Sequence, residues 1–553
     1  MQSQGKKLLA VSMIFAVALV YRLIYIHQFS QYPIFSSLDI DQEYYHFWAK
    51  RIAAGDLMSG TEVFEMTPLY AYMLGFFYKF ISTDIFTLKV AQSVAGSISA
   101  VMIFFLAGRV FKSFAIAVVA GGMAAMYAPF VHYDNMVMKS FLTVFFSVAS
   151  LIFLYRGEER GSLLDALFAG ASIGLLALVR ENAILLIAGV VIWFIFRFPA
   201  REAAKSSGVF LAGFFLVMSP VAIRNYVVSG DIVLNTAGGG EVFYIGNNPE
   251  ADGTYKAPPF LKTLHPFKEH EEFRSEAQRL TGRVLTRKES SDFWFGQGLD
   301  FIKANPGQFT WLVYRKFVMF WNFYERPDNL NFYFMKTLAS SLNYGITYGV
   351  LAPLGILGIF LSLRDWRKNS LLYIFLLTYL ASMLLVFNFA RFRIPIVPVI
   401  MLWAAFSLVW FYHKAAVRDW KKVGAAIGVL ALLFIGVNCR FDGVRPYTDF
   451  FDTEYHKMGK AYLQLDRLKE ARENYEALIR VNPSNVFGYA GLARVAMKEN
   501  RNEDAVAELE KGLGVEPQNA GLYMLLATAY NNLGQTEKAQ GALNVAFRLG
   551  QGG

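Results

Sequence analysis

Three acidic side chains lie close together near the amino terminus. Residues 39–45 read Asp-Ile-Asp-Gln-Glu-Tyr-Tyr, so Asp39, Asp41 and Glu43 fall within about one and a half helical turns. They come about a dozen residues after a hydrophobic stretch that ends near His27. A carboxylate at that depth can act as a general base on a substrate that is itself anchored in lipid. The pattern therefore predicts chemistry at a membrane surface.

Aromatic side chains share the helical face of one of these acids. From Asp41 to Gly55 the sequence favours a helix, on which Asp41, Tyr44, Tyr45 and Trp48 follow i, i+3, i+4, i+7 spacing. Such a face could stack a sugar while the acid accepts a proton. The alternative is an interfacial helix with an aromatic belt and a solvated acid.

The composition is that of a membrane protein. Of 553 residues, 55% are hydrophobic and only 17% are charged, against roughly 25% charged in soluble domains. The single cysteine, Cys439, excludes an internal disulfide framework. The net charge of +10 is spread over short loops, which is how membrane topology is encoded, so we expect no nucleic-acid partner.

Eleven stretches are apolar enough to be membrane-spanning helices, which need roughly 20 residues. We predict spans at about 8–27, 86–108, 113–131, 136–155, 162–179, 183–199, 207–224, 344–363, 369–388, 392–412 and 421–438. The first stretch, Leu8–Ile26, lacks a small-residue cleavage site, so we interpret it as a retained anchor.

The segment Pro68–Ile81 decides the topology. It is short, begins with proline and carries Lys79 near its end. If it does not cross, the basic clusters of alternate loops all fall on one side, which the positive-inside bias makes cytoplasmic. We therefore predict a juxtamembrane or re-entrant helix there, an internal amino terminus and an external carboxyl terminus.

Several basic residues lie against this bias, at the outer ends of predicted spans. A lipid phosphate would explain them, and their alternatives are local pairing with Asp134 or Glu181, or snorkelling to headgroups. These residues are Lys139, Arg180, Arg224, Arg391 and Arg393. We predict substrate binding for this set together with Asp134 and Glu181.

Metal and nucleophile patterns are weak. No His or Cys cluster has metal-ligand spacing, and no Ser/His/Asp arrangement can be recognised. We expect no metal ligand and no certain cofactor, although a divalent cation held by carboxylates stays open.

The large outer loop over 225–343 has two halves. The first is rich in glycine, asparagine and proline, and Gly238-Gly239-Gly240 follows a strand-like Ile232–Leu234 without a helix of phosphate-binding spacing. A flexible substrate-facing loop is favoured over a nucleotide site. The second half, 269–316, has an amphipathic helical pattern.

The tail contains an internal repeat of 34 residues. Pro483 and Pro517 are separated by this period, as are Ala471, Ala505 and Ala539. The small, aromatic and proline spacing is typical of the tetratricopeptide repeat. We predict about three stacked helix pairs over 455–553, after a linker at 441–454. The groove of such an array usually holds a polypeptide, and a spacer or dimerising cap is the alternative.

At this point the chain resembles the polytopic glycosyltransferases of the GT-C class. The resemblance covers residues 8 to about 412 and is closest to dolichyl-phosphate-mannose protein mannosyltransferases and bacterial aminoarabinose transferases. The motifs that carry it are Asp41-x-x-x-Tyr45, Trp48-Ala49, Gly55-Asp56, Pro68-Leu69-Tyr70, Leu178–Asn182, Arg224-Asn225-Tyr226 and Ala390–Pro398. Some members also carry a tetratricopeptide tail.

The resemblance implies a fold and a role for one acid. The fold would be an α-helical GT-C membrane bundle over residues 1–440, with a first outer loop at 28–85, followed by an all-α repeat solenoid. Asp41 would be the catalytic base and a polyprenyl-phosphate sugar the donor. Many relatives have adjacent Asp-Glu, whereas Gln42 here separates Asp41 from Glu43, so Asp39 or Glu43 could share the role.

The leading hypothesis is an inverting glycosyltransferase on the outer face of a membrane, with a protein, lipid or glycan as acceptor. An oligosaccharide ligase or polymerase, a transporter or flippase for a lipid-linked substrate, and a membrane-anchored repeat scaffold are the alternatives. The expected location is a bacterial inner membrane, with Asp41 and the repeats on the periplasmic side. There the tail could guide an acceptor polypeptide, so truncation before Tyr455 should mainly weaken acceptor use.

Overall fold

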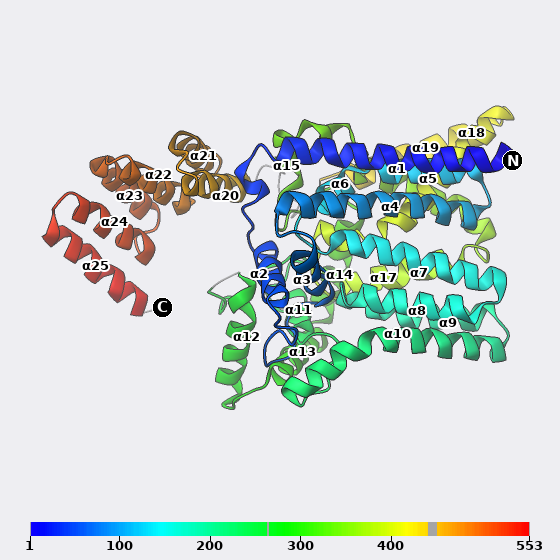
Figure 1. Cartoon of the computed structure of the whole chain (residues 1–553), viewed down its shortest axis with the longest axis horizontal. Helices are drawn as coiled ribbons and strands as arrows, with labels where there is room; N and C mark the ends of the chain where they lie inside the picture. Colours follow the sequence, from blue (N-terminus) through cyan, green and yellow to red (C-terminus); the bar gives the residue numbers. More distant parts are fainter. Residues whose placement is uncertain (1, 263–264, 441–450, 552–553) are drawn as a thin grey trace. The chain divides into compact units, whose positions relative to one another are not determined.

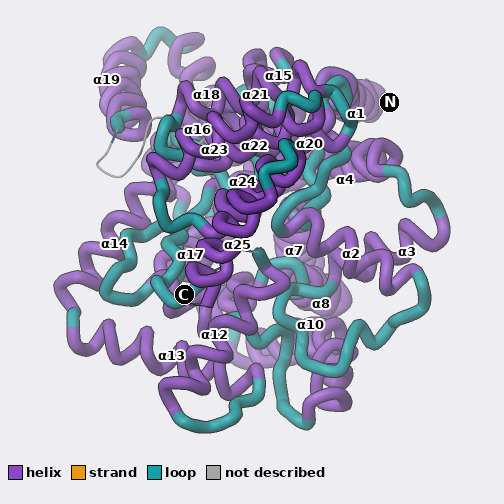
Figure 2. The backbone as a smooth tube through the Cα atoms, turned by 90° about the vertical axis from the view of Figure 1, so that its left-hand side faces the viewer, coloured by secondary structure: helices purple, strands orange, loops and turns teal. Residues whose placement is uncertain are grey.

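The protein is built from helices and loops. The computed structural model describes residues 2–262, 265–440 and 451–551, and Figure 2 shows helices joined by loops throughout these ranges. Within them, the one pairing of extended backbone is an isolated bridge between Tyr127 and Ile346. The predicted all-α class is confirmed.

The chain divides into two compact units. The first comprises Met1–His27, Leu38–Asn329 and Ser340–Phe441, and the second comprises Gln28–Ser37, Leu330–Ala339 and Asp442–Gly553. Two short segments from the membrane half of the sequence therefore group with the tail. The predicted linker at 441–454 falls mostly on residues 441–450, outside the described residues, and 451–454 are already helical.

Seven helices of the described chain are long and apolar enough to cross a membrane, so the protein is a multi-pass integral membrane protein. They are α1 (Gln2–Phe29), α4 (Ile85–Phe111), α7 (Ser140–Arg160), α10 (Ala200–Ser229), α16 (Tyr348–Ser362, extended by a 3₁₀ turn at Leu363–Asp365), α18 (Val397–Ala416) and α19 (Trp420–Asn438).

Four shorter helices occupy the remaining predicted spans. They are α5 (Phe114–Ala125), α8 (Leu163–Ala177), α9 (Leu186–Arg197) and α17 (Ser370–Leu384). At 1.5 Å per residue, a helix the length of α5 extends about 18 Å, against about 30 Å of hydrocarbon. A helix thus lies at every predicted position, but only some have the full length of a span.

The predicted span over 113–131 is interrupted. Helix α5 ends at Ala125, Tyr127 is extended, and a separate helix α6 (Ala128–Asp134) follows with Pro129 in its first turn. Proline lacks a backbone N–H, so a continuous helix through Pro129 would lose a hydrogen bond. The chain instead forms the bridge to Ile346 at this point.

The non-spanning elements of the first unit gather at one end of the bundle. Figure 1 shows α2 (Asp41–Ala53), α3 (Leu69–Phe80) and the helices within Gly239–Trp321 of the large loop at the end opposite the amino terminus. Helix α3 has 12 residues and packs on α2. The short helix predicted at Pro68–Ile81 is confirmed.

The large loop is more helical than its composition indicates. It contains α11 (Gly239–Gly246), α12 (Pro266–Thr281), α13 (Arg287–Ala304), α14 (Pro306–Trp321), α15 (Phe332–Leu338) and a 3₁₀ helix at Ser340–Tyr344. The amphipathic second half is confirmed as α12 to α14. The strand-like pattern at Ile232–Leu234 does not form a strand, and α11 begins within the glycine triplet, at Gly239.

Close packing explains one glycine of the triplet. A Cβ on Gly240 would lie 1.8 Å from the carbonyl oxygen of Ser291 in α13, so only glycine lets the two helices approach this closely. Gly240 therefore serves the packing of α11 on α13.

The tail forms three helix pairs. They are α20 (Phe451–Gln464) with α21 (Leu468–Val481), α22 (Val486–Lys498) with α23 (Asn502–Val515), and α24 (Ala520–Asn532) with α25 (Thr536–Gln551). The repeated alanines Ala471 and Ala505 are fully buried, and the prolines Pro483 and Pro517 follow α21 and α23. The ring of Tyr475 occupies the space that a side chain at Gly459 or Gly491 would fill.

Candidate active site

Asp41 occupies the first position of α2, directly after a strained residue, and its side chain is held by neighbours. Ile40, just before it, has φ 51° and ψ −121°, a conformation that costs energy for a β-branched residue. The side-chain amide of Asn329 accepts a hydrogen bond from the Asp41 N–H at 3.2 Å and donates to Asp41 Oδ2 at 3.3 Å. Asp41 is 7% exposed, so its carboxylate is buried and held in one position by these bonds.

An arginine shared between two carboxylates fixes the charge of Asp41. Arg391 Nη2 lies 2.8 Å from Asp41 Oδ2, and Arg391 Nε contacts Asp328. Burial alone would raise the pKa of Asp41, but Arg391, with Lys139 and Asn329, outweighs it and lowers the pKa. Asp41 is therefore ionised at neutral pH and able to accept a proton.

Gln42 connects α2 to the turn that carries a second basic residue of the site, Lys139. The side-chain carbonyl of Gln42 accepts a hydrogen bond from the Val137 N–H at 3.0 Å, which ties α2 to the turn that carries Lys139. Lys139 Nζ donates to Thr67 Oγ1 at 2.5 Å and lies near Asp41. Burial, then the neighbouring Arg180 and Arg391, lower the pKa of Lys139 to about 7.

Arg180 is the third cation of the cluster. Its guanidinium stacks on the ring of Phe392 at 3.8 Å, and its Nη2 is buried without a hydrogen-bond partner among the described residues. Within the described chain, neither Arg180 nor Lys139 forms an ion pair with a carboxylate at 4.0 Å or less. Lys139 lies near Asp41, and Arg180 lies near Lys139 and Arg391, so the cluster holds two basic side chains without a carboxylate partner, as a phosphate-binding site requires.

The other two acids of the cluster are placed differently. Glu43 turns towards the large loop, where His265 Nε2 lies 3.2 Å from its carboxylate. Asp39 is half-buried, and its backbone carbonyl accepts the Gln42 N–H at 3.1 Å, in the turn that begins α2. Of the three, Asp41 is the one paired with Arg391.

The aromatic face of α2 is mostly interior. Tyr45 is fully buried and Trp48 is 8% exposed, both within a cluster that includes Tyr70 and Phe64. This packing leaves little ring surface for a sugar. Tyr44 is half-buried and is the one of the three that faces the large loop, against Phe267 at 5.0 Å.

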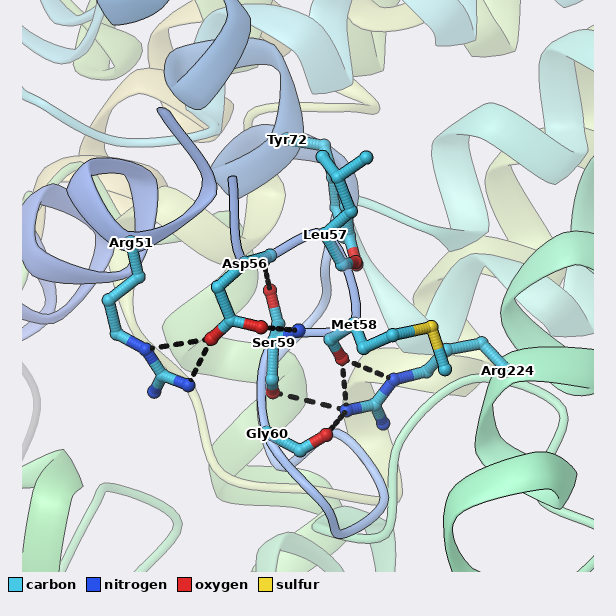
Figure 3. A network of polar contacts seen from close by, with 8 residues as sticks. All are labelled: Arg51, Asp56, Leu57, Met58, Ser59, Gly60, Tyr72 and Arg224. Carbon is cyan, nitrogen blue, oxygen red and sulfur yellow. Dashed lines mark hydrogen bonds and ion pairs between the residues drawn. The ribbon is translucent and has the colours of Figure 1, made fainter. Parts of the chain in front are cut away.

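Arg224 holds a loop. Its guanidinium donates to the carbonyl oxygens of Met58, Ser59, Gly60 and Glu62 at 2.6–3.1 Å, as Figure 3 shows for the first three. Asp56 fixes the same loop through the Ser59 N–H at 2.8 Å. The geometry of Arg224 favours a structural role over the predicted contact with substrate.

Three further predicted binding residues have protein partners. Arg393 pairs with Glu325 at 2.7 Å, and both side chains are 1% exposed. Asp134 pairs with Arg22 at 2.8 Å and is 3% exposed. Glu181 accepts a hydrogen bond from Thr236 and lies near Lys139. Arg393 and Asp134 are closed off from solvent, whereas Glu181 borders the cation cluster.

Two site residues escaped prediction because they act across long sequence separations. Both come from the large loop: Asn329 meets Asp41 of α2 across 288 residues, and Asp328 beside it pairs with Arg391. Their local pattern, Arg-Pro-Asp-Asn, indicates a turn and nothing more. In residues 2–262, 265–440 and 451–551, no group of three or more His, Cys, Asp or Glu could hold a metal ion.

The comparisons with known proteins bear on this geometry. Residues 65–223 match the family model described as dolichyl-phosphate-mannose-protein mannosyltransferase. Over these residues the chain is similar to that glycosyltransferase family. The match includes Thr67, Lys139 and Arg180 and begins after Asp41. Residues 455–485 and 496–551 match tetratricopeptide-repeat models, which confirms the predicted tail.

Individual proteins are more distant. Cellulose synthase operon protein C of Pseudomonas fluorescens is 32% identical over 92 residues, which are 17% of this chain and 7% of that protein. The chain thus spans a small part of that relative.

Three solved structures share helical architecture at low identity. ArnT from Cupriavidus metallidurans bound to undecaprenyl phosphate is 13% identical, with 92% of this chain and 80% of ArnT covered and a TM-score of 0.44. The oligosaccharyltransferase of Archaeoglobus fulgidus in its apo form is 13% identical, with 80% and 58% covered and a TM-score of 0.43. The S. cerevisiae protein O-mannosyltransferase complex bound to the sugar donor is 14% identical, with 42% and 35% covered and a TM-score of 0.32. Scores this low carry no argument about the site.

Proposed function

We propose that the protein transfers one sugar from a polyprenyl-phosphate donor to an acceptor hydroxyl, with inversion at the anomeric carbon. The observation that supports this most is an ionised Asp41 next to Lys139, which in turn lies near Arg180; within the described residues neither basic side chain pairs with a carboxylate. A base and an anion site side by side are what transfer from a lipid phosphate needs.

The reaction divides between these groups. Asp41 takes the proton of the acceptor hydroxyl as its oxygen bonds to the anomeric carbon. The bond from that carbon to the phosphate oxygen breaks, and the electron pair leaves with the lipid phosphate. Lys139 and Arg180 stabilise the charge that grows on the phosphate. Arg391 is held by Asp328 and pairs with Asp41, so it keeps the Asp41 carboxylate ionised and oriented.

The topology proposed with this reaction has eleven spans, an internal amino terminus and an external active site. Two observations support it. The basic loops at the other end of the bundle pair with local acids, as in Arg109 and Lys112 with Glu159. The end of α19 lies at the site's end, because Asn322 donates to the carbonyl oxygens of Val437 and Cys439.

We further propose a bacterial inner membrane as the location, with the site and the tail in the periplasm, and an envelope protein, lipid or glycan as acceptor. A reporter fused at Gly553 should then be external. A cytoplasmic reporter would overturn the eleven-span topology. Mass spectrometry of envelope proteins and lipids, with and without the gene, should reveal a lost increment of one sugar and so identify both sugar and acceptor.

The role of Asp41 can be tested in the purified full-length protein with hexose, aminosugar and pentose polyprenyl phosphates. Asp41→Asn should lose transfer by about 10²–10⁴-fold, because an amide cannot accept the proton. Thermal unfolding should show that the variant is folded, and binding of polyprenyl phosphate should persist.

Two neighbouring acids provide matched controls. Asp39→Asn and Glu43→Gln each remove one negative charge two residues from Asp41, away from the pair with Arg391. Both should keep transfer within a few-fold of the wild type. Near-wild-type transfer by Asp41→Asn, or equal losses in all three variants, would remove Asp41 from the role of base.

A further inference from the structure

The tail's first helix is built into one unit with two short segments from the membrane half of the chain. These are Gln28–Ser37 and Leu330–Ala339, which group with Asp442–Gly553. Each segment lies close in sequence to a residue at the candidate site. The first leads within a few residues to Ile40 and Asp41, and the second directly follows Asn329.

The second segment is anchored to α20 by a buried hydrogen bond and by aromatic packing. Glu454 Oε1 accepts the Asn331 N–H at 3.0 Å, and Glu454 is 2% exposed. The Phe334 ring packs edge-on against Phe451 and Tyr455, each at 5.2 Å. Asn331 also begins α15, because its side chain accepts the Tyr333 and Phe334 N–H groups.

The first segment contacts the same helix. It forms a 3₁₀ turn, Pro33–Phe35, that packs on α20. Ile34 and Phe35 are 4% and 5% exposed, and the Phe35 ring packs edge-on against Phe29 at 5.2 Å. One helix of the tail therefore holds both chain segments that lead into the site.

We propose that α20 is a brace for the candidate base, with Glu454 and Phe334 as positioning residues. Through Asn331, Glu454 fixes the backbone two residues from Asn329, and Asn329 holds both the N–H and the carboxylate of Asp41. An acceptor bound by the repeats could act on catalysis along this path as well as by proximity. The effects on transfer that this proposal predicts rest on the proposed function. The effects on backbone dynamics rest on the geometry alone.

The brace changes what loss of the tail should do. Proximity alone predicts that transfer to a small acceptor survives truncation before Tyr455. That truncation removes most of α20, so the brace predicts that small-acceptor transfer falls as well. Point variants in the full-length protein separate the two, because they leave the repeats in place.

The structural test is hydrogen exchange of full-length protein in detergent. Glu454→Ala should speed exchange about tenfold or more at residues 330–334 and also at 40–42, where the Asp41 N–H depends on Asn329. Glu476→Ala, an exposed glutamate on α21, is the matched control and should change neither region. Faster exchange at 330–334 with none at 40–42 would overturn the brace whatever the enzyme's activity.

The kinetic test uses a small acceptor and the pH profile of kcat/KM. Glu454→Ala should lower kcat about tenfold at unchanged donor KM, comparable to losing one hydrogen bond to a charged group. Because Asn329 helps to lower the pKa of Asp41, the acid limb should move to higher pH. Asn329→Ala should shift it in the same direction, and the double variant should add little.

The outcomes separate this proposal from the proposed function. If Asp41→Asn is fully active, the proposed function fails, yet coupled exchange at 40–42 would still support the brace. If Asp41→Asn is inactive while Glu454→Ala has the control's exchange, kcat and pH profile, the brace is wrong and the proposed function stands.

Discussion

Two arginines on one 3₁₀ turn, Ala390–Arg393, pair with two carboxylates of one loop, but they differ in burial and in their other neighbours. Arg393 lies 2.7 Å from Glu325, and both side chains are 1% exposed. Arg391 lies between Asp328 and Asp41, with 12% of its side chain exposed and with Lys139 and Arg180 nearby. Both pairs join the same two segments of the chain, and their surroundings differ.

The difference teaches which pair can do chemistry. Arg393 also donates to the Asn322 carbonyl at 2.6 Å and stacks on Tyr348 at 3.6 Å, so its charge is committed to the interior. A fully buried pair specifies packing and is costly to break. Arg391 instead joins a proton acceptor to a region with surplus positive charge. One pair should therefore control folding and the other turnover.

The largest expected effect breaks the buried pair. Glu325→Ala leaves Arg393 charged and unpaired in the interior, which should destabilise the protein by about 3–5 kcal/mol. Thermal unfolding in detergent measures this. Glu62→Ala, at a more exposed carboxylate, is the control and should cost about 1 kcal/mol or less. Equal effects would mean that burial does not distinguish the two pairs.

The next effect disturbs the open pair. Arg391→Lys keeps a positive charge but cannot hold Asp41 and Asp328 together, so transfer should fall about 10²-fold. Arg391 holds the pKa of Asp41 down, so its loss raises that pKa, and activity should disappear at a higher pH on acidification. The unfolding temperature should drop less than in Glu325→Ala. If Arg391→Lys lost stability but kept its kcat, Arg391 would have a structural role like that of Arg393.

A smaller effect concerns Lys139, which has no carboxylate partner within the described residues. The pKa of Lys139 is about 7, so its charge is present below that pH and is lost above it. We expect kcat/KM for the donor to fall as pH rises through about 7, and Lys139→Arg to remove this limb. Lys139→Met should raise the donor KM about tenfold at pH 6. An unchanged donor KM in Lys139→Met would show that Lys139 does not bind the donor phosphate.

The smallest effect separates the two ends of the aromatic face. Tyr44→Ala should lower kcat/KM less than about tenfold, in line with the loss of one aromatic contact, and leave stability nearly unchanged. Trp48→Ala should instead destabilise by about 3–5 kcal/mol, because Trp48 fills the core. The unfolding temperatures of the two variants test this contrast.

Local pattern was enough to predict the helices. The apolar stretches, the short segment Pro68–Ile81 and the repeat positions Ala471, Ala505 and Pro483 depend on composition and period within a few turns. The exception at 113–131 has a local cause that could have been used, because Pro129 stands inside the predicted span.

Long-range pairing could not be predicted in the same way. Asp41 stood out as an acid near a membrane, but nothing near it in sequence indicates Asn329 or Asp328. Arg391 and Arg393 look equivalent in sequence, and only the partners Asp41 and Glu325 distinguish them. The separator Gln42 looked like a departure from the family pattern and proves to anchor α2 to Val137.

The central claim, that Asp41 is a general base and not a nucleophile, can be tested by rescue with azide. Asp41→Ala should scarcely transfer to a hydroxyl acceptor, but azide attacks the anomeric carbon without deprotonation. We predict that added azide restores donor consumption, and that the glycosyl azide and the wild-type product are both inverted relative to the donor, as read by NMR. A nucleophile would give a wild-type product of retained configuration, so that result, or no rescue, would contradict the account.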